Sequence, residues 1–194
     1  MRARLVALTL TLTGAVLAAQ TPISWRIKDA PAKLRPTIAR ADLMIAAMHD
    51  SVLRELSDAF EGGGADKAIL SCHIDSVLMA QRIGREGVAA GRTSDRLRNP
   101  TNTPRPWAAE LVMANAGRMA GDVDGFAVDL GDKIGVLRPI SQRALCANCH
   151  GPAEQLSAGI RRELAERYPA DKALGFKPGE IRGWFWVEIP KRPR

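Results

Sequence analysis

Apolar residues recur every three or four positions from about Pro36 to Phe60, the spacing that keeps side chains on one face of an α-helix. They are Ile38, Ala41, Met44, Ile45, Met48, Val52, Leu56 and Phe60. Pro36 suits the first turn of such a helix. Consecutive glycines at 62–64 interrupt the pattern, and a second helix is predicted from Ala65 to Ile83. We therefore expect an N-terminal amphipathic helix within residues 20–61 and a domain over residues 62–194.

The second half of the chain combines helical and strand patterns. Alternation in Phe126–Leu130 and Ile134–Leu137, on either side of a glycine-containing turn, predicts a β-hairpin. Helices are predicted from Ala108 to Met119 and from Ala153 to Arg167, and a final strand from Ile181 to Ile189. The aromatic residues of that strand indicate core packing, or the wall of a bound cofactor, rather than a nucleic-acid surface. Helices that lead into an antiparallel sheet predict an α+β fold.

The first residues have the pattern of an export signal. Arg2 and Arg4 form a basic start, an apolar run extends from Leu5 to Leu17, and Ala18-Ala19 supply small residues for cleavage. The run is shorter than the roughly 20 residues of a spanning helix, although an uncleaved anchor is the alternative. We expect a signal peptide over residues 1–19 and a soluble periplasmic protein with no integral membrane span in the mature chain.

The net charge adds little to this picture. The chain carries +7, and two of the positive charges, Arg2 and Arg4, belong to the predicted signal. The remaining basic residues are spread along the sequence rather than gathered into a patch. This distribution indicates solubility, and we expect no nucleic-acid partner.

The three cysteines carry the most specific chemistry. Cys146 and Cys149 lie in Cys-Ala-Asn-Cys-His, and Cys72 is the third. An odd set cannot pair completely in an oxidising compartment, and a bridge within the motif would constrain little of the chain. The alternatives are a zinc site completed by Cys72 or His73, a thioredoxin-like redox motif, which would need a preceding strand, and chance. Export and the spacing favour covalent attachment of haem c.

Haem attachment explains the order of the motif. Two thiols add to the two haem vinyl groups when two residues in a tight turn separate them, and His150 is then placed under the ring as an iron ligand. Gly151 lets the backbone run close to the macrocycle. The motif occurs once, so one haem is expected, covalently bound through Cys146 and Cys149.

A second axial ligand is required for six-coordinate iron. The candidates are His49, Cys72, His73, Met44, Met48, Met79, Met113 and Met119. Methionine and histidine are the usual choices in c-type proteins, and a surface or capping role is expected for His49. In the predicted helix, Cys72 and His73 project about 100° apart, so one can face the iron while the other turns away. This pattern alone does not choose between them.

The stretch from Gly91 to Trp107 supports two interpretations. Arg98-Asn99-Pro100 and Thr103-Pro104 are typical of a rigid connection tied down by Asn side chains. Alternatively, Arg92, Arg96 or Arg98 pairs with the haem propionates. Arg98 is the preferred propionate partner, and Asn99 beside it is assigned to the cofactor site.

Several motifs in a fixed order resemble one family. They are Ala68-Ile-Leu-Ser-Cys72, Gly91-Arg-Thr-Ser94, Arg98 to Pro104 with Trp107, Arg138-Pro-Ile140, Cys146 to Gly151, and Asp171 to Gly183. Together they resemble the PAS-like haem c domains of the Tll type, long catalogued as a domain of unknown function. The resemblance extends over roughly Gly62 to Pro190, about three quarters of the mature chain, and implies a PAS-like antiparallel sheet.

The resemblance also implies a ligand set. The cysteine that ends the Ala-Ile-x-x-Cys element is the distal ligand of the family, so Cys72 becomes the second iron ligand opposite His150. An anionic thiolate favours ferric iron and lowers the reduction potential. His73 is a possible replacement ligand.

Two classes of function follow from such a haem. In a sensor, iron redox state or displacement of Cys72 by NO or CO changes the helix that bears it, and a separate signalling protein detects the change. In an electron carrier, the ligands stay fixed and a redox protein is the partner. Neither a substrate pocket nor an acid–base pair is evident in the sequence, so no enzymatic activity is expected.

Overall fold

A computed structural model describes residues 22–83 and 87–192 of the chain, apart from the side chains of residues 64–67 and 70–83. The predicted signal peptide lies outside the described residues. The helices are α1 (Arg35–Ile83), α2 (Ala109–Ala114), α3 (Ala144–His150) and α4 (Ala158–Arg167). The strands are β1 (Ser24–Arg26), β2 (Ala89–Thr93), β3 (Phe126–Asp129), β4 (Lys133–Ser141) and β5 (Ile181–Pro190). None of the described helices is both long and apolar enough to cross a membrane.

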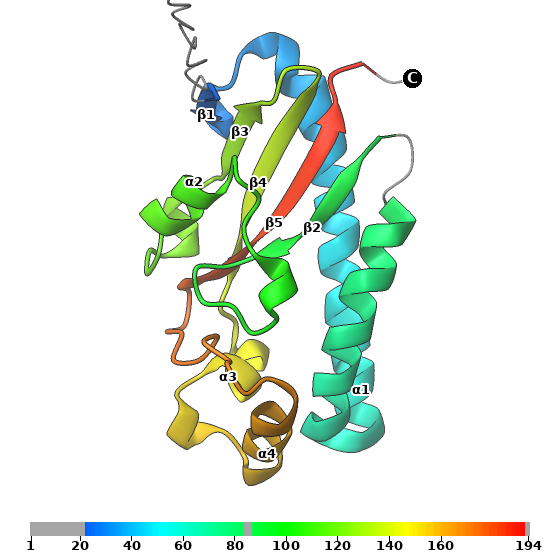
Figure 1. Ribbon diagram of the computed structural model, residues 1–194, viewed down its shortest axis with the longest axis vertical. Coiled ribbons are helices and arrows are strands. Elements are labelled where there is room, and N and C mark those ends of the chain that lie inside the picture. Colours follow the sequence, from blue (N-terminus) through cyan, green and yellow to red (C-terminus); the bar gives the residue numbers. More distant parts are fainter. Residues whose placement is uncertain (1–21, 84–86, 193–194) are drawn as a thin grey trace, which may run out of the picture.

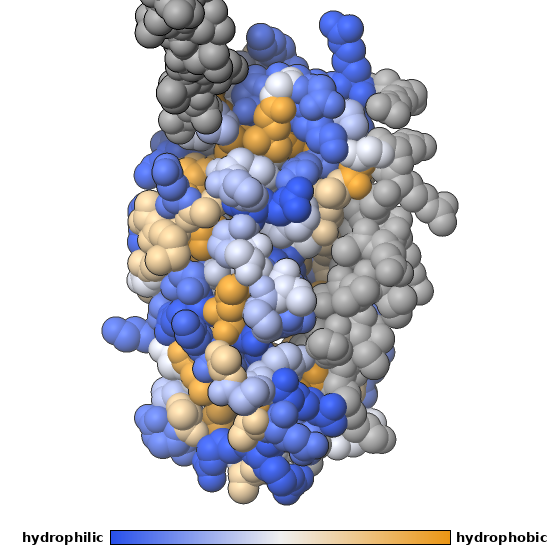
Figure 2. Space-filling model, in the orientation of Figure 1, coloured by the Kyte–Doolittle hydropathy of each residue, from blue (hydrophilic) through white to orange (hydrophobic). Residues whose placement is uncertain are grey.

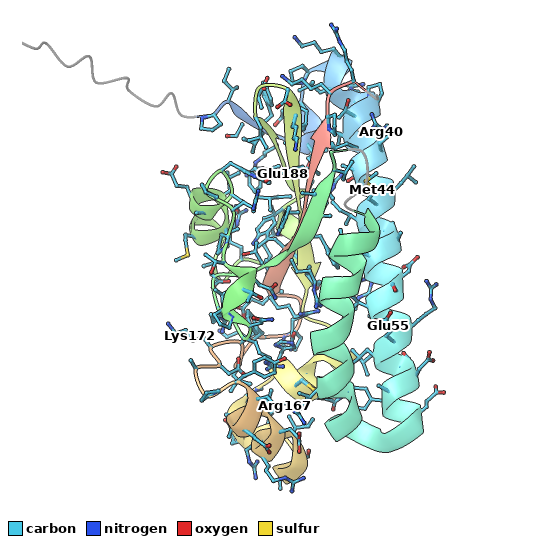
Figure 3. All side chains as sticks on the ribbon, turned by 45° about the vertical axis from the view of Figure 1, so that its right-hand side comes forward. Arg40, Met44, Glu55, Arg167, Lys172 and Glu188 are labelled. Atoms are coloured by element: carbon cyan, nitrogen blue, oxygen red, sulfur yellow. The ribbon has the colours of Figure 1, made fainter. Side chains whose placement is uncertain are left out.

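The strands form one antiparallel sheet in the order β1-β3-β4-β5-β2. Helices and an antiparallel sheet in one unit confirm the predicted α+β fold. In Figure 1, α1 lies along one face of the sheet, α2 lies near the other face, and α3 and α4 gather at the lower end. The α1 ribbon folds back on itself near that end, so its two arms lie side by side (Figures 1 and 3).

The first arm of α1 confirms the helical period predicted from the sequence. Ile38, Ala41, Ile45 and Met48 are buried against sheet residues such as Val136 and Val187 in one hydrophobic core. Strand β1 precedes this arm and pairs with β3. The first arm of α1 thus shares its core with the sheet. The glycines at 62–64 were predicted to separate two helices, but they lie within α1.

The opposite face of the sheet has a second core. Ala108 and Val112 from the α2 region pack with Leu137, Ile181 and Trp184. Burial of Trp184, only 1% exposed, confirms that the aromatic residues of the last strand serve packing. On the face drawn in Figure 2, hydrophobic residues form small patches separated by polar ones.

The predicted hairpin is present as β3 and β4, and β4 continues through Pro139 to Ser141. Two helices are shorter than predicted. The helix expected from Ala153 begins at Ala158, because the side chain of Ser157 caps it by accepting a hydrogen bond from the Ile160 amide. The helix expected to reach Met119 ends at Ala114, and Gly117 beyond it adopts a positive φ of 74°.

Candidate functional site

A cavity lies between α1, the sheet and the α3 region, and it brings together most of the predicted site residues. Cys146, Cys149, His150, Arg98 and Asn99 all line it. The apolar part of its wall is made by Val52, Leu56, Phe60, Ala68, Ile69, Leu97, Ile140 and Leu145. An apolar cavity with a few convergent polar groups is the usual form of a cofactor site.

The Cys-Ala-Asn-Cys-His motif forms helix α3 rather than an isolated tight turn. In a helix, residues three apart lie on the same face, so Cys146 and Cys149 both reach the cavity. A Cβ at Gly151 would lie 2.7 Å from the Ala147 carbonyl oxygen. Gly151 is therefore required because its backbone lies close to the backbone of α3, the helix that it follows.

His150 is held in one orientation by a backbone carbonyl. Its Nδ1 lies 2.8 Å from the oxygen of Ala173. Because a carbonyl only accepts, Nδ1 carries the proton and the lone pair remains on Nε2. Histidines that bind metals commonly donate their other ring N–H to a carbonyl or carboxylate in this way. The Phe176 ring makes an edge contact with the imidazole, with centroids 6.2 Å apart.

Electrostatics keep this imidazole neutral. Burial lowers the pKa of His150 well below its usual value, and the positive charges of Arg182, Arg98 and Arg92 lower it further. The hydrogen bond to Ala173 opposes these effects but does not outweigh them. A neutral imidazole is the form that binds a metal.

Asp171 and Arg98 form a brace around the motif. Asp171 Oδ1 accepts a hydrogen bond of 2.8 Å from the Ala173 amide, and its Oδ2 accepts one of 3.0 Å from Arg98 Nε. Arg98 Nη2 donates to the carbonyls of Cys149 and Ala173. The brace therefore joins the end of α3 to the residue that orients His150.

The sequence allowed two roles for Arg98, a structural one and pairing with a haem propionate. These contacts match the structural role. Its guanidinium holds a carboxylate and two carbonyls, so its role as propionate partner stays a prediction. Asn99 has a structural contact as well: its Oδ1 accepts hydrogen bonds from the amide and hydroxyl of Thr101 and caps the turn that follows. Asn99 ties down the connection, as its sequence context predicted.

The candidates for the second axial ligand divide into two groups. Among the described side chains, His49, Met44, Met48, Met113 and Met119 are absent from the cavity wall. His49 is 34% exposed and packs edge-on against Phe185, and Met113 and Met119 lie on the surface. The side chains of Cys72, His73 and Met79, all in α1, lie outside the described residues.

The described residues of the cavity fit a haem, and the zinc alternative depends on Cys72 or His73, whose side chains lie outside the described residues. In the described part of the chain, no three His, Cys, Asp or Glu side chains converge as metal ligands would. The two thiols and the oriented imidazole instead line a mainly apolar cavity, and the buried Nε of Arg182 in the same wall has no hydrogen-bond partner. Such a cation suits a cofactor that carries carboxylates.

Sequence reasoning missed three contributors to this site. Asp171, Ala173 and Phe176 lie in a segment noted only as part of the family resemblance, and hydrogen bonds from Gly175 to Gly151 and from Phe176 to His150 place it beside the motif. No periodic pattern marks these residues, because they lie in a loop outside the assigned helices and strands.

Comparisons with known proteins identify the family. The family model of Tll0287-like proteins matches residues 16–190, so the chain belongs to the Tll0287-like family. This match begins well before Gly62, where the resemblance in the sequence was placed. Among curated proteins, none matches the sequence.

A solved structure has the same fold. The crystal structure of the cyanobacterial heme-protein Tll0287 superposes with a TM-score of 0.56 at 21% sequence identity. The match covers 85% of this chain and 99% of that one.

Asp171→Asn tests the brace. Removing the carboxylate leaves the partly buried guanidinium of Arg98, whose side chain is 15% exposed, without its ion-pair partner, and we expect the free energy of unfolding to fall by about 3 kcal/mol. Chemical denaturation of the purified protein measures this change. As a control, Glu163→Gln removes a surface ion pair with Arg167, which should cost less than about 1 kcal/mol. Equal losses in the two variants would contradict the role of Asp171.

Proposed function

We propose that this chain is a periplasmic c-type haem protein that binds one haem covalently through Cys146 and Cys149. The observation that carries the proposal is that His150 lines the same cavity as both cysteines of the motif. The Ala173 carbonyl orients its imidazole and leaves the Nε2 lone pair available. Membership of the Tll0287-like family, which includes a heme-protein, supports the same conclusion. The bound haem supplies redox chemistry and a site for small ligands at its iron.

The second ligand is proposed to be Cys72, as the family resemblance implies. Ala68 and Ile69 face the cavity from α1, and position 72 follows them by about one helical turn. Met79 lies ten positions after Ile69, which is about 15 Å farther along the helix. Cys72 is therefore the proposed ligand, and His73 is its possible replacement.

The proposed role is to sense redox state or a small gas. His150 is on α3 and Cys72 is on α1, so the iron would link two elements that are far apart in the sequence. Ile69, one turn before Cys72, packs against Leu156, Ile160 and Leu164 of the α4 region. A change of the ligand on α1 would thus reach a surface helix through direct packing. A signalling protein that binds this region would detect the change.

Cys72→Ala tests the ligand assignment. Loss of a thiolate from ferric iron should change the absorption and EPR spectra and raise the midpoint potential, because the anionic ligand stabilises ferric iron. A redox titration followed by EPR, on protein matured by a cytochrome c assembly system, measures all three properties. His73→Ala is the matched control and should leave them unchanged. Unaltered spectra in Cys72→Ala would remove this residue as a ligand.

Addition of CO or NO to the reduced protein tests the sensing role. We expect a ligand-bound absorption spectrum and loss of thiolate coordination, since sensing requires Cys72 to be displaced. The alternative is a small electron-transfer cytochrome c, whose ligands stay fixed. Failure to bind either gas, together with fast reversible electron exchange with a redox protein, would overturn sensing of these gases and favour the carrier.

A further inference from the structure

Arg182 occupies an irregular position in the sheet. Strand β5 pairs with β4 so that Gly183 is opposite Ile140 and Ile181 is opposite Ser141. These partners leave Arg182 as an extra residue on β5 between two consecutive positions of β4. An extra residue of this kind is a β-bulge, which bends a strand and re-aims side chains, often beside a functional site.

Packing on the two faces of the sheet shows how the bulge redirects the strand. Phe185 and Val187 belong to the core under α1, whereas Trp184 belongs to the core under α2. In a regular strand, Ile181 and Phe185 would point to the same face of the sheet. Ile181 instead packs in the core on the opposite face, together with Trp184. The alternation therefore shifts by one residue at the bulge. As a result, Arg182 and Gly183 both line the cavity on the α1 side.

Several cations line the cavity. Its described wall includes Arg92, Arg96, Arg98 and Arg182 but no carboxylate. Two of these arginines are neutralised from outside the wall, since Arg96 pairs with Glu180 and Arg98 pairs with Asp171. Arg182 differs, because its Nε is buried and has no hydrogen-bond partner. A buried donor without a partner is costly, so an anionic group in this cavity would be strongly favoured.

Arg92 adds a second positive charge on the same side of the sheet. It lies opposite Phe185 in the pairing of β2 with β5, and directly opposed residues of an antiparallel pair point to the same face. Arg92 and Arg182 thus approach the cavity from adjacent strands. Two cations in an apolar cavity with two thiols and an imidazole match a macrocycle whose edge carries carboxylates.

We propose that Arg182, turned into the cavity by the bulge, binds a propionate carboxylate of the haem, with Arg92 adding positive charge beside it. The inference rests on the proposed function, and it assigns to Arg182 the contact that the sequence had assigned to Arg98. Arg182 acts on the potential of the iron through that carboxylate. A cation that pairs with a propionate keeps it ionised and stabilises the reduced haem.

Arg182→Gln in the haem-loaded protein tests this role. Reduction adds negative charge to the haem, so removing a nearby cation should lower the midpoint potential at pH 7. The pKa of the propionate should also rise by about 1–3 units. Because burial raises the pKa of a carboxyl that has lost its cation, the potential of the variant should increase as the pH is lowered toward 5, while that of the natural protein stays nearly constant. Potentiometric titrations from pH 5 to 8 measure both effects.

Three further variants make the result specific. Arg143→Gln removes an exposed arginine at the start of α3 and should leave the pH profile unchanged. Arg182→Lys keeps the charge but lacks the second donor of the guanidinium, so it should show the same change as Arg182→Gln at a smaller size. If Arg182→Gln does not accumulate, Arg182→Lys and Arg92→Gln decide, since each should depart from the Arg143→Gln profile in the same direction. Profiles that match the Arg143→Gln control would overturn the role of Arg182. Secreted protein that contains no haem would instead overturn the proposed function, and this inference with it.

Discussion

The hydrogen bond between His150 Nδ1 and the Ala173 carbonyl is the interaction on which the site depends. It fixes the tautomer of the imidazole and leaves the lone pair on Nε2. The carbonyl is itself held in place, because Asp171 binds the Ala173 amide and Arg98 binds both the Ala173 and Cys149 carbonyls. The short helix α3, which carries the motif, thereby gains a rigid support from a loop more than 20 residues later in the chain.

The sheet serves this site in two ways. Strands β2, β4 and β5 form the wall opposite α1, and the bulge at Arg182 brings a cation to a face that regular alternation would have left to Ile181. Close approach of large side chains to glycines holds the wall together. A Cβ at Gly91 would lie 2.7 Å from the Trp186 ring, and a Cβ at Gly135 would lie 3.0 Å from Trp107. Both tryptophans lie on the α2 side, so they support the wall without entering the cavity.

The sequence predicted those parts of the fold that have a regular period. The first arm of α1 follows from apolar spacing because it buries one face against a single core, and the β3–β4 hairpin follows from the alternation of its residues between the cores on the two faces of the sheet. Strand β2 was missed since Ala89-Ala-Gly-Arg-Thr93 has little strand propensity, and its glycine is explained only by the approach of Trp186. Likewise, the Cys-Ala-Asn-Cys-His motif identified the attachment residues, but the loop that orients His150 and the bulge that redirects Arg182 depend on tertiary contacts that no local pattern records.

The most direct test of this account is mass spectrometry of the protein, produced together with a cytochrome c assembly system, after digestion with trypsin. Cleavage after Arg143 and Arg161 releases a peptide of residues 144–161 that contains both Cys146 and Cys149. The account predicts that this peptide carries the added mass of one haem and that neither cysteine reacts with an alkylating reagent. A peptide of unmodified mass with two alkylated cysteines would contradict it.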